Sequence, residues 1–352
     1  MAFELGILTF GELTTDLTTG RMPSPEERMK QTIEQARVAD EVGLDVFGVG
    51  EHHRTDFVAS APHMVLAAAA MATRNIQLTS GVTVLSSEDP VRVFQNFATL
   101  DLISGGRAEI IAGRGSYTES FPLFGYDLGD YADLFREKLD LLLAIRAENP
   151  VSWQGRLRAP LVNADIAPRP ISDLPIWVGV GGTPASAVRT GQLGLPLALA
   201  LLLGPITQFE RPVDLYRQAS VAAGHDLSSQ RISINAHGMV GKTSQSARDD
   251  FFPYFSRGLG ENNHQRGASF NLPRNAFEAQ ASPAGGLLVG SPQEIIDKLL
   301  TYHDLYGVSR AVFQMGFGGV PQQTHLEAIE RLGTEVAPVI RAEIASRESV
   351  NA

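Results

Sequence analysis

Short apolar runs alternate with longer segments of helical periodicity along most of the chain. Apolar, β-branched runs bounded by Gly, Pro or polar residues predict buried strands, whereas apolar positions spaced three or four residues apart predict helices. Eight runs meet the strand criterion. They lie at residues 3–10, 46–53, 76–85, 107–112, 175–180, 196–203, 231–240 and 310–315.

Helical patterns separate these strands, and several have clear N-terminal signals. Ser24-Pro25-Glu26-Glu27 and Ser291-Pro292-Gln293-Glu294 are predicted capping boxes, and Asp89 before Pro90 is a predicted N-cap. The predicted helices lie at 25–43, 62–73, 90–102, 131–148, from 184 onward, 206–223, 292–306 and 322–344. Eight strands alternating with eight helices predict a parallel (β/α)₈ TIM barrel, an α/β fold. A doubly wound open sheet is the alternative, but no Gly-x-Gly-x-x-Gly turn follows the first strand.

Two segments interrupt this alternation. Residues 149–173 are rich in Pro and polar residues and predict an excursion across the surface. Residues 257–288 follow a short predicted helix at 244–256, lack periodicity and are rich in Gly, Asn and Pro. Long irregular loops in compact domains are usually functional or mobile, so we expect a lid-like insertion there. The prediction is one TIM-barrel domain over residues 1–352, with these two insertions.

Composition narrows the possible partners. The chain has 352 residues, a formal net charge of -10, no Lys/Arg block and no cysteine. Nucleic-acid binding would require a basic stripe, and disulfides, thiolate metal sites and cysteine nucleophiles all require cysteine. The N-terminus lacks a signal-peptide pattern, and the apolar run 195–204 is too short to span a bilayer. We therefore expect a cytoplasmic protein without nucleic-acid or membrane partners.

The second predicted strand runs directly into Glu51, His52 and His53. In a TIM barrel the C-terminal strand ends face the active site, and histidine can transfer protons near neutral pH. These three residues are therefore the candidate catalytic group. The simpler alternative is a histidine that only hydrogen-bonds to backbone at the strand exit.

Two glycine-rich strand exits predict an anion site. Arg114 stands between Gly113 and Gly115 and is followed by Ser116, so its guanidinium could bind a phosphate. The second exit leads into a predicted helix, whose free N–H groups and dipole favour an anion. It comprises Gly181, Gly182, Thr183 and Ser186. The alternatives are a surface arginine in a flexible loop and an ordinary N-cap at Thr183.

Small residues inside the third strand, Ser80, Gly81 and Val82, suggest a bulge or close approach of a flat ligand, or else a packing accommodation. Thr9 and Phe10 end the first strand at the same face. A metal site is not expected, because adjacent histidines in a strand point to opposite faces and no H-x-H or HExxH pattern occurs. The G-x-S-x-G elbow of serine hydrolases is also missing.

Three stretches together resemble the bacterial luciferase-like flavin-dependent monooxygenases. They are the Glu-His-His motif, residues 89–115 (DPVRVFQNFATLDLISGGRAEIIAGRG) and residues 175–199 (PIWVGVGGTPASAVRTGQLGLPLAL). The resemblance is loose over 206–288 and returns weakly at 290–319. It implies a TIM barrel that binds FMN, reduced by NAD(P)H or by a separate flavin reductase, with O₂ and a small organic molecule as substrates. It also implies a homodimer formed through the second and third helices.

The resemblance also assigns roles to residues. His52, flanked by Glu51 and His53, matches the catalytic histidine, which would stabilise or protonate the flavin hydroperoxide. Arg114, Gly182, Thr183 and Ser186 match positions that hold the FMN phosphate. Gly81-Val82 falls where the family often has a cis peptide behind the isoalloxazine ring. The rest of the candidate cofactor site comprises Thr9, Phe10, Ser80, Gly115, Ser116 and Gly181.

Two positions depart from the family pattern. Long-chain members often have Glu where this chain has Gly182, and the proline expected after the third strand is Ser86. Three other functions stay open at this point. They are hydride transfer with the deazaflavin F420 on the same barrel, flavin binding without catalysis, and metal-dependent hydrolysis.

Overall fold

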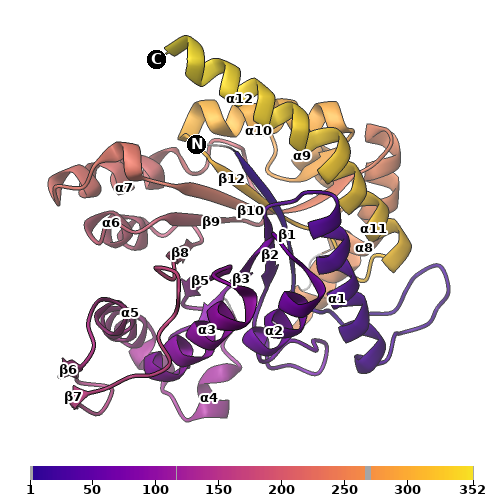
Figure 1. The fold of residues 1–352 in the computed structure, drawn as a ribbon. Coiled ribbons are helices and arrows are strands. Elements are labelled where there is room, and N and C mark those ends of the chain that lie inside the picture. Colours follow the sequence, from indigo (N-terminus) through magenta and orange to yellow (C-terminus); the bar gives the residue numbers. More distant parts are fainter. Residues whose placement is uncertain (1–2, 116, 266–270, 352) are drawn as a thin grey trace.

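Eight parallel strands form a closed barrel at the centre of the computed structural model, which describes residues 3–115, 117–265 and 271–351 (Figure 1). Each strand pairs with the next, and β1 pairs with both β2 and β12, so the sheet closes. In order around the barrel they are β1 (Glu4–Thr9), β2 (Val46–Val49), β3 (Gln77–Ser80), β5 (Ala108–Gly113), β8 (Ile176–Val180), β9 (Leu197–Leu201), β10 (Ile232–Val240) and β12 (Arg310–Gln314). The predicted TIM barrel is confirmed.

Helices surround the barrel and alternate with its strands (Figure 1). They are α1 (Pro25–Glu41), α2 (Pro62–Ala72), α3 (Pro90–Ser104), α5 (Tyr131–Ala147), α6 (Pro184–Gln192), α7 (Glu210–Ala222), α10 (Pro292–Tyr306) and α11 (Gln322–Arg331). A π-helical turn, Leu332–Val336, joins α11 to α12 (Ala337–Asn351). The capping box of Ser24 and Glu27 and the N-cap at Asp89 are confirmed, and Ser291 accepts the Glu294 N–H as predicted.

The predicted strand 76–85 is interrupted at its middle. β3 ends at Ser80, and a short strand, β4 (Thr83–Val84), pairs separately with β5. The peptide bond between Gly81 and Val82 is cis, as the family resemblance implied. The predicted start of the helix at 206 is wrong, since α7 begins at Glu210. Pro205 and Ile206 instead pair with the backbone at Gly285 and Ala284.

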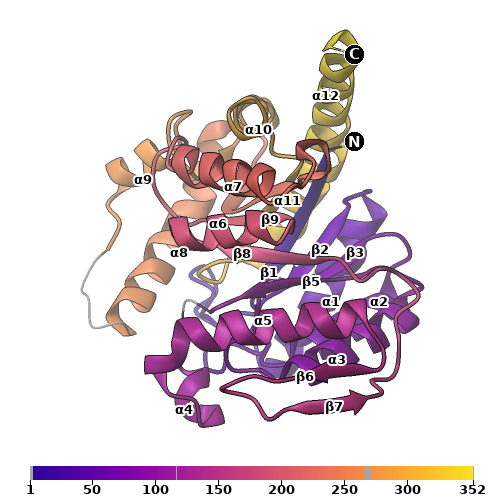
Figure 2. The ribbon, with the colours of Figure 1, turned by 90° about the vertical axis from the view of Figure 1, so that its left-hand side faces the viewer.

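The excursion 149–173 contains an antiparallel hairpin of β6 (Val151–Trp153) and β7 (Leu161–Ala164), which the sequence patterns did not predict. Figure 2 shows this hairpin at the edge of the molecule, beyond α3 and α5. Glu137 on α5 holds the hairpin loop, because its carboxylate accepts hydrogen bonds from the backbone N–H groups of Arg156, Leu157 and Arg158 at 2.8 to 3.1 Å.

The lid-like segment is more regular than predicted. Helix α8 (Ser244–Gln265) continues well beyond residue 256, and α9 (Arg274–Ala281) and β11 (Leu288–Gly290) follow it. The expectation of an irregular segment over 257–288 is therefore wrong for these stretches. Aromatic packing explains the difference, because Phe255 of α8 contacts Phe277 of α9 and Phe317 after β12, with ring centroids 5.9 and 5.6 Å apart.

Buried side chains fill the N-terminal end of the barrel. The Arg310 guanidinium is paired with Glu109 and Glu4 and lies 4.3 Å from the centre of the Trp177 ring. Arg310 and Trp177 are both almost fully buried. A second interior cluster is formed by Leu8, Val46 and Val312. The barrel is therefore a packed core and not a pore.

Candidate active site

The predicted site residues lie at the C-terminal ends of five barrel strands, β1, β2, β3, β5 and β8. Because parallel strands end at the same edge, these residues share the barrel mouth. Ser116 lies outside the described residues. The others are Thr9, Phe10, Glu51, His52, His53, Ser80, Gly81, Val82, Arg114, Gly115, Gly181, Gly182, Thr183 and Ser186.

His52 is enclosed by three aromatic rings. Its ring centre lies 4.7 Å from Phe10, 4.4 Å from Phe57 and 4.5 Å from Tyr117. Its Nδ1 lies 3.3 Å from Oε1 of Glu119. Glycine at position 50 makes room for this arrangement, since a Cβ there would lie 2.0 Å from the Phe10 ring. The packing gives His52 a defined orientation at the barrel mouth.

His53 pairs with a different carboxylate. Its Nε2 lies 2.9 Å from Oε1 of Glu51, and the other oxygen of Glu51 accepts the N–H of Val84 at 2.9 Å. The hydrogen bond with Glu51 raises the pKa of His53 above its ordinary value. The two adjacent histidines therefore bond to separate carboxylates, and Glu51 also connects the end of β2 to β4.

A half-buried carboxyl and a buried amine lie behind this pair. Burial, with added repulsion from Glu51, raises the pKa of Glu88 to about 7. Burial also lowers the pKa of Lys138 to about 8. The Lys138 ammonium donates to the carbonyl of Ser86 at 2.8 Å and lies 3.8 Å from the Tyr126 ring centre. Ser86, which stands where the family has proline, is thus bound to Lys138 through its backbone carbonyl.

Arg114 and Thr183 meet on the other side of the mouth. The guanidinium donates to the Thr183 hydroxyl at 3.2 Å and lies 5.4 Å from the centre of the Tyr131 ring. Thr183 is the N-cap of α6, but its side chain makes no capping bond to the helix. Its neighbour Gly182 has φ of +98°, and Ser186 lies in the first turn. The helix N-terminus and the guanidinium both favour a negatively charged group, so the arrangement is compatible with the predicted anion site.

Two glycines beside these groups are required by close packing. A Cβ at Gly81 would lie 2.4 Å from Leu8, and one at Gly113 would lie 2.5 Å from Val82. The Val82 side chain packs against Ile111 and its neighbours. The backbone at these two positions therefore approaches these side chains more closely than a residue with a Cβ would allow.

The hydroxyl groups of two residues predicted to bind the cofactor form hydrogen bonds within the protein. The Ser80 hydroxyl bonds to both the carbonyl and the N–H of Ile111, and the Thr9 hydroxyl accepts the N–H of Gly11. Both side chains are buried. At these positions the hydroxyls stabilise the strand ends.

Sequence patterns did not identify Phe57 and Glu119. They placed Tyr117 in the glycine-rich exit of residues 113–117 but did not predict its contact with His52. Glu119 is 67 residues from His52 in the chain. Phe57 and Tyr117 lie in loops without periodicity. In the sequence, Glu119 is an acidic residue five positions after Arg114. Its contact with His52 forms because the barrel brings the ends of β2 and β5 to one mouth.

Among the residues that the structure describes, no group of three His, Asp or Glu side chains could hold a metal ion. No helix in the same described residues has the length and apolar character needed to cross a membrane.

The fold is a TIM barrel whose mouth carries a histidine–carboxylate pair, His52 with Glu119, and an arginine at a helix N-terminus, Arg114 beside Thr183. The family model described as luciferase-like monooxygenase matches residues 3–309, and the chain belongs to this family of oxidoreductases. One relative is the alkanal monooxygenase alpha chain of the Kryptophanaron alfredi symbiont. It is 23% identical over 344 residues, covering 90% of this chain and 94% of the relative.

Solved structures show the same fold. The monooxygenase RslO1 from Streptomyces bottropensis has a TM-score of 0.80 at 23% identity, covering 96% of this chain and 99% of its own. The oxygenating constituent of 3,6-diketocamphane monooxygenase from Pseudomonas putida, in complex with FMN, has a TM-score of 0.75 at 21% identity. The match covers 96% of this chain and 98% of that structure. An F420-dependent secondary alcohol dehydrogenase has a TM-score of 0.74 at 16% identity. The match covers 96% of this chain and 99% of that structure.

Proposed function

We propose that the protein is an FMN-dependent monooxygenase that uses reduced FMN and O₂ to oxidise a small organic substrate. The observation that carries this proposal is the contact of Arg114 with Thr183 at the N-terminus of α6, on the same mouth as His52. Reduced FMN, when bound, supplies the electrons that activate O₂. The electrons would come from NAD(P)H or from a flavin reductase.

The residues of the mouth divide into three roles. Arg114, Thr183 and Ser186, with the backbone at Gly181 and Gly182, would bind the phosphate. The backbone at Gly81, Val82 and Gly115 would lie against the ring. His52 would hold or transfer a proton, while the aromatic rings around it exclude water, which strengthens electrostatic interactions in the site.

A binding experiment tests the phosphate assignment. Arg114→Ala should raise the Kd for FMN by about ten- to a hundredfold, because a charge-assisted hydrogen bond contributes about 1.5–3 kcal/mol. Riboflavin, which lacks the phosphate, should bind both proteins equally, and Arg114→Lys should lose less affinity. Flavin fluorescence quenching measures all of these. Equal FMN affinity in Arg114→Ala would refute the assignment.

A turnover experiment tests the catalytic assignment. His52→Ala should bind FMN normally and lose about a hundredfold or more in substrate oxidation with reduced FMN and O₂, the usual scale of general acid–base catalysis. His53→Ala should weaken the β2–β4 connection and lower stability. Unchanged turnover in His52→Ala would rule out its assigned role.

Hydride transfer with F420 is the second candidate, because an F420-dependent enzyme shares the barrel over nearly its whole length. A protein that binds F420 and not FMN, and that works without O₂, would favour this candidate. A tight FMN complex that accepts no electrons from NAD(P)H and does not react with O₂ when reduced would instead favour a non-catalytic flavin-binding protein.

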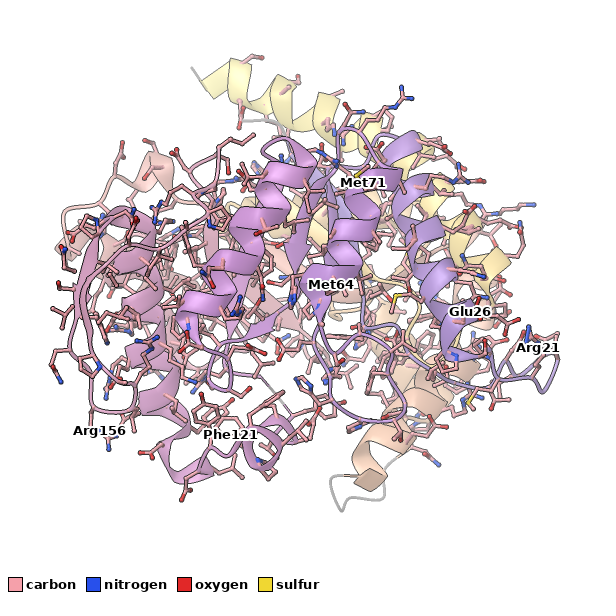
Figure 3. The ribbon with its side chains drawn as sticks, turned by 60° about the horizontal axis from the view of Figure 1, so that its bottom comes forward. Arg21, Glu26, Met64, Met71, Phe121 and Arg156 are labelled. Atoms are coloured by element: carbon pink, nitrogen blue, oxygen red, sulfur yellow. The ribbon has the colours of Figure 1, made fainter. Side chains whose placement is uncertain are left out.

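We also propose a homodimer formed through α2 and α3. Met64 and Met71 are 66% and 77% exposed, and Figure 3 shows both on α2, which packs beside α3. Leu102 and Ile103, near the end of α3, are both 46% exposed. Analytical ultracentrifugation should show a dimer that Met71→Glu dissociates, whereas Leu227→Glu, at another exposed apolar position, should leave it intact.

We further propose that residues 1–352 form one domain located in the cytoplasm. The absence of cysteine fits a reducing compartment. Fractionation of cells that express the protein tests the location, and unfolding measurements test the domain assignment.

A further inference from the structure

Glu119 lies in the loop after β5, at the start of the short helix α4 (Ser120–Phe124). Its side chain makes no capping bond to that helix. Instead, Oε1 lies 3.3 Å from Nδ1 of His52 and 3.4 Å from the backbone nitrogen of His53. The carboxylate is therefore directed across the mouth, toward the end of β2.

The charge state of Glu119 determines which ring nitrogen of His52 carries hydrogen. Burial disfavours the charged carboxyl, but the hydrogen bonds with the His52 ring and the backbone outweigh it and lower the pKa of Glu119 to about 2. An ionised carboxylate only accepts hydrogen bonds, so Nδ1 of His52 must be the donor. In the neutral ring, Nε2 then has the free electron pair.

The surroundings hold His52 in one orientation. Its side chain is 8% exposed, and the rings of Phe10, Phe57 and Tyr117 pack around it. Within the described part of the chain, Nδ1 is the ring nitrogen with a hydrogen-bond partner. Rotating the ring by half a turn about the Cβ–Cγ bond would put Cδ2 in the place of Nδ1 and break the bond with Glu119.

The other charged groups around the mouth have partners of their own. Arg54 is paired with Asp56, and its guanidinium lies 5.0 and 4.8 Å from the Phe57 and Tyr117 ring centres. His53 is paired with Glu51, and Glu12 accepts a hydrogen bond from Gln314. Arg114 donates to Thr183, and the charge of Arg54 also attracts Glu119. Glu119 is thus the carboxylate in contact with the His52 ring in the described structure.

We propose that Glu119 is the positioning residue of His52, which directs Nε2 toward the barrel mouth and stabilises the ring when Nε2 takes up a proton. In that step the new N–H bond uses the Nε2 electron pair. The donor, an O–H or N–H group of a bound molecule, keeps the electrons of the bond that breaks, and Glu119 stays ionised. The inference rests on the proposed role of His52 in proton transfer.

Histidine nitrogen NMR of the full-length protein tests this proposal, with His52→Gln used to identify the His52 signals. In the original protein the neutral His52 ring should have its hydrogen on Nδ1, and Glu119→Gln should lower the ratio of this tautomer to the Nε2–H tautomer about tenfold, because a hydrogen bond to a charged group contributes about 1.5–3 kcal/mol. Glu119→Asp, which keeps the charge on a shorter side chain, should give an intermediate ratio. The kcat/KM of Glu119→Gln should fall by about the same factor, with the Kd for FMN within about twofold of the original.

Glu88→Gln is the matched control, because Glu88 is also half-buried but acts on Glu51 and His53. It should lower the pKa of His53 and leave the tautomer ratio of His52 unchanged. An unchanged His52 tautomer ratio in Glu119→Gln would overturn the proposal and reduce Glu119 to a loop contact.

If Glu119→Gln fails to fold, the original protein still decides the question. Carboxyl carbon NMR should show Glu119 titrating well below an ordinary glutamate, and an ordinary value would overturn the proposal. A protein that binds no FMN would refute the proposed function, while the His52 tautomer ratio would still report on Glu119.

Discussion

Two adjacent histidines at the end of β2 are distinguished by two carboxylates from different parts of the chain. Glu51 is two residues from His53, whereas Glu119 reaches His52 from the loop after β5. The two carboxylates place the two histidines in different surroundings. The buried Glu51 supports the backbone at Val84, and Glu119 faces the mouth. His52 and His53 are therefore adjacent in sequence but have different hydrogen-bond partners and surroundings.

Glu88 gives a prediction about pH and stability. Burial and Glu51 raise its pKa to about 7 in the folded protein, above the 4.5 of an ordinary glutamate. The folded state binds this proton more tightly, so the stabilisation is full below pH 4.5 and is lost as the pH rises through 7. Glu88→Gln should therefore be more stable than the original at about pH 8, by on the order of 1–2 kcal/mol after allowance for partial exposure.

Urea unfolding at several pH values measures this difference, which should vanish near pH 4. Lys30→Gln, at an exposed site on α1, should show no such pH dependence. A constant difference for Glu88→Gln across the whole range would show that the carboxyl is not shifted.

At the residue scale, the sequence identified most groups that ring the mouth, because strand exits in a barrel follow from local patterns. Glu51, His52, Arg114 and Thr183 could all be assigned from such patterns. Glu119 could not, since a contact across 67 residues has no local signal. Nor do local patterns show that the hydroxyls of Thr9 and Ser80 are bonded to backbone.

Carboxylates on helices hold several of the connecting segments. Asp40 on α1 accepts the N–H groups of residues 74–76, and Asp101 on α3 accepts those of Ile171 and Ser172. Glu137 on α5 does the same for the loop of the β6–β7 hairpin. These hydrogen bonds fix where each loop meets its helix.

Glu137→Gln should loosen the hairpin loop and leave the barrel intact. An amide has one acceptor oxygen and no charge, so the bonds to residues 156–158 weaken, and the unfolding free energy should fall by about 1–2 kcal/mol. Hydrogen exchange followed by mass spectrometry should show faster exchange at these residues. Glu148→Gln, at the exposed end of the same helix, is the control. Unchanged exchange at 156–158 would contradict the assigned contact.

At the element scale, local chemistry predicted the caps at Ser24 and Asp89 well, because these contacts span two or three residues. It failed over 257–288. Helix α8 contains Pro253 and is held by aromatic packing with α9 and the segment after β12. Such packing is invisible in a local pattern, and so is the pairing of β6 with β7.

The closed barrel links all parts of the molecule. Arg310 on β12 reaches Glu109 on β5 and Glu4 on β1, so one buried ion cluster connects strands from three parts of the chain. Removing one partner of a buried pair leaves an uncompensated charge, which typically destabilises by about 3–5 kcal/mol.

Glu109→Gln should therefore lower the stability of the whole molecule by about 3 kcal/mol without changing the Kd for FMN, because the cluster lies at the opposite end of the barrel from the mouth. Tryptophan fluorescence and far-UV circular dichroism should show one coincident transition in both proteins, as one domain requires. Separate transitions would contradict the single-domain proposal. An altered FMN affinity would show that the two ends are coupled.

At the scale of the whole molecule, the alternation of strands and helices predicted the barrel because each βα unit must bury its apolar face against the next. The arrangement inside the barrel did not follow from the same pattern. Arg310, Glu109 and Trp177 become neighbours through closure, which brings the first and last strands together.

The packed N-terminal end of the barrel also limits access to the interior. Because Arg310, Glu109 and Trp177 fill that end, a small molecule would reach the residues around His52 from the C-terminal mouth. In the proposed monooxygenase, a product that dissociates slowly from the mouth would therefore block both the next substrate and the exchange of oxidised cofactor. Product release would then limit kcat.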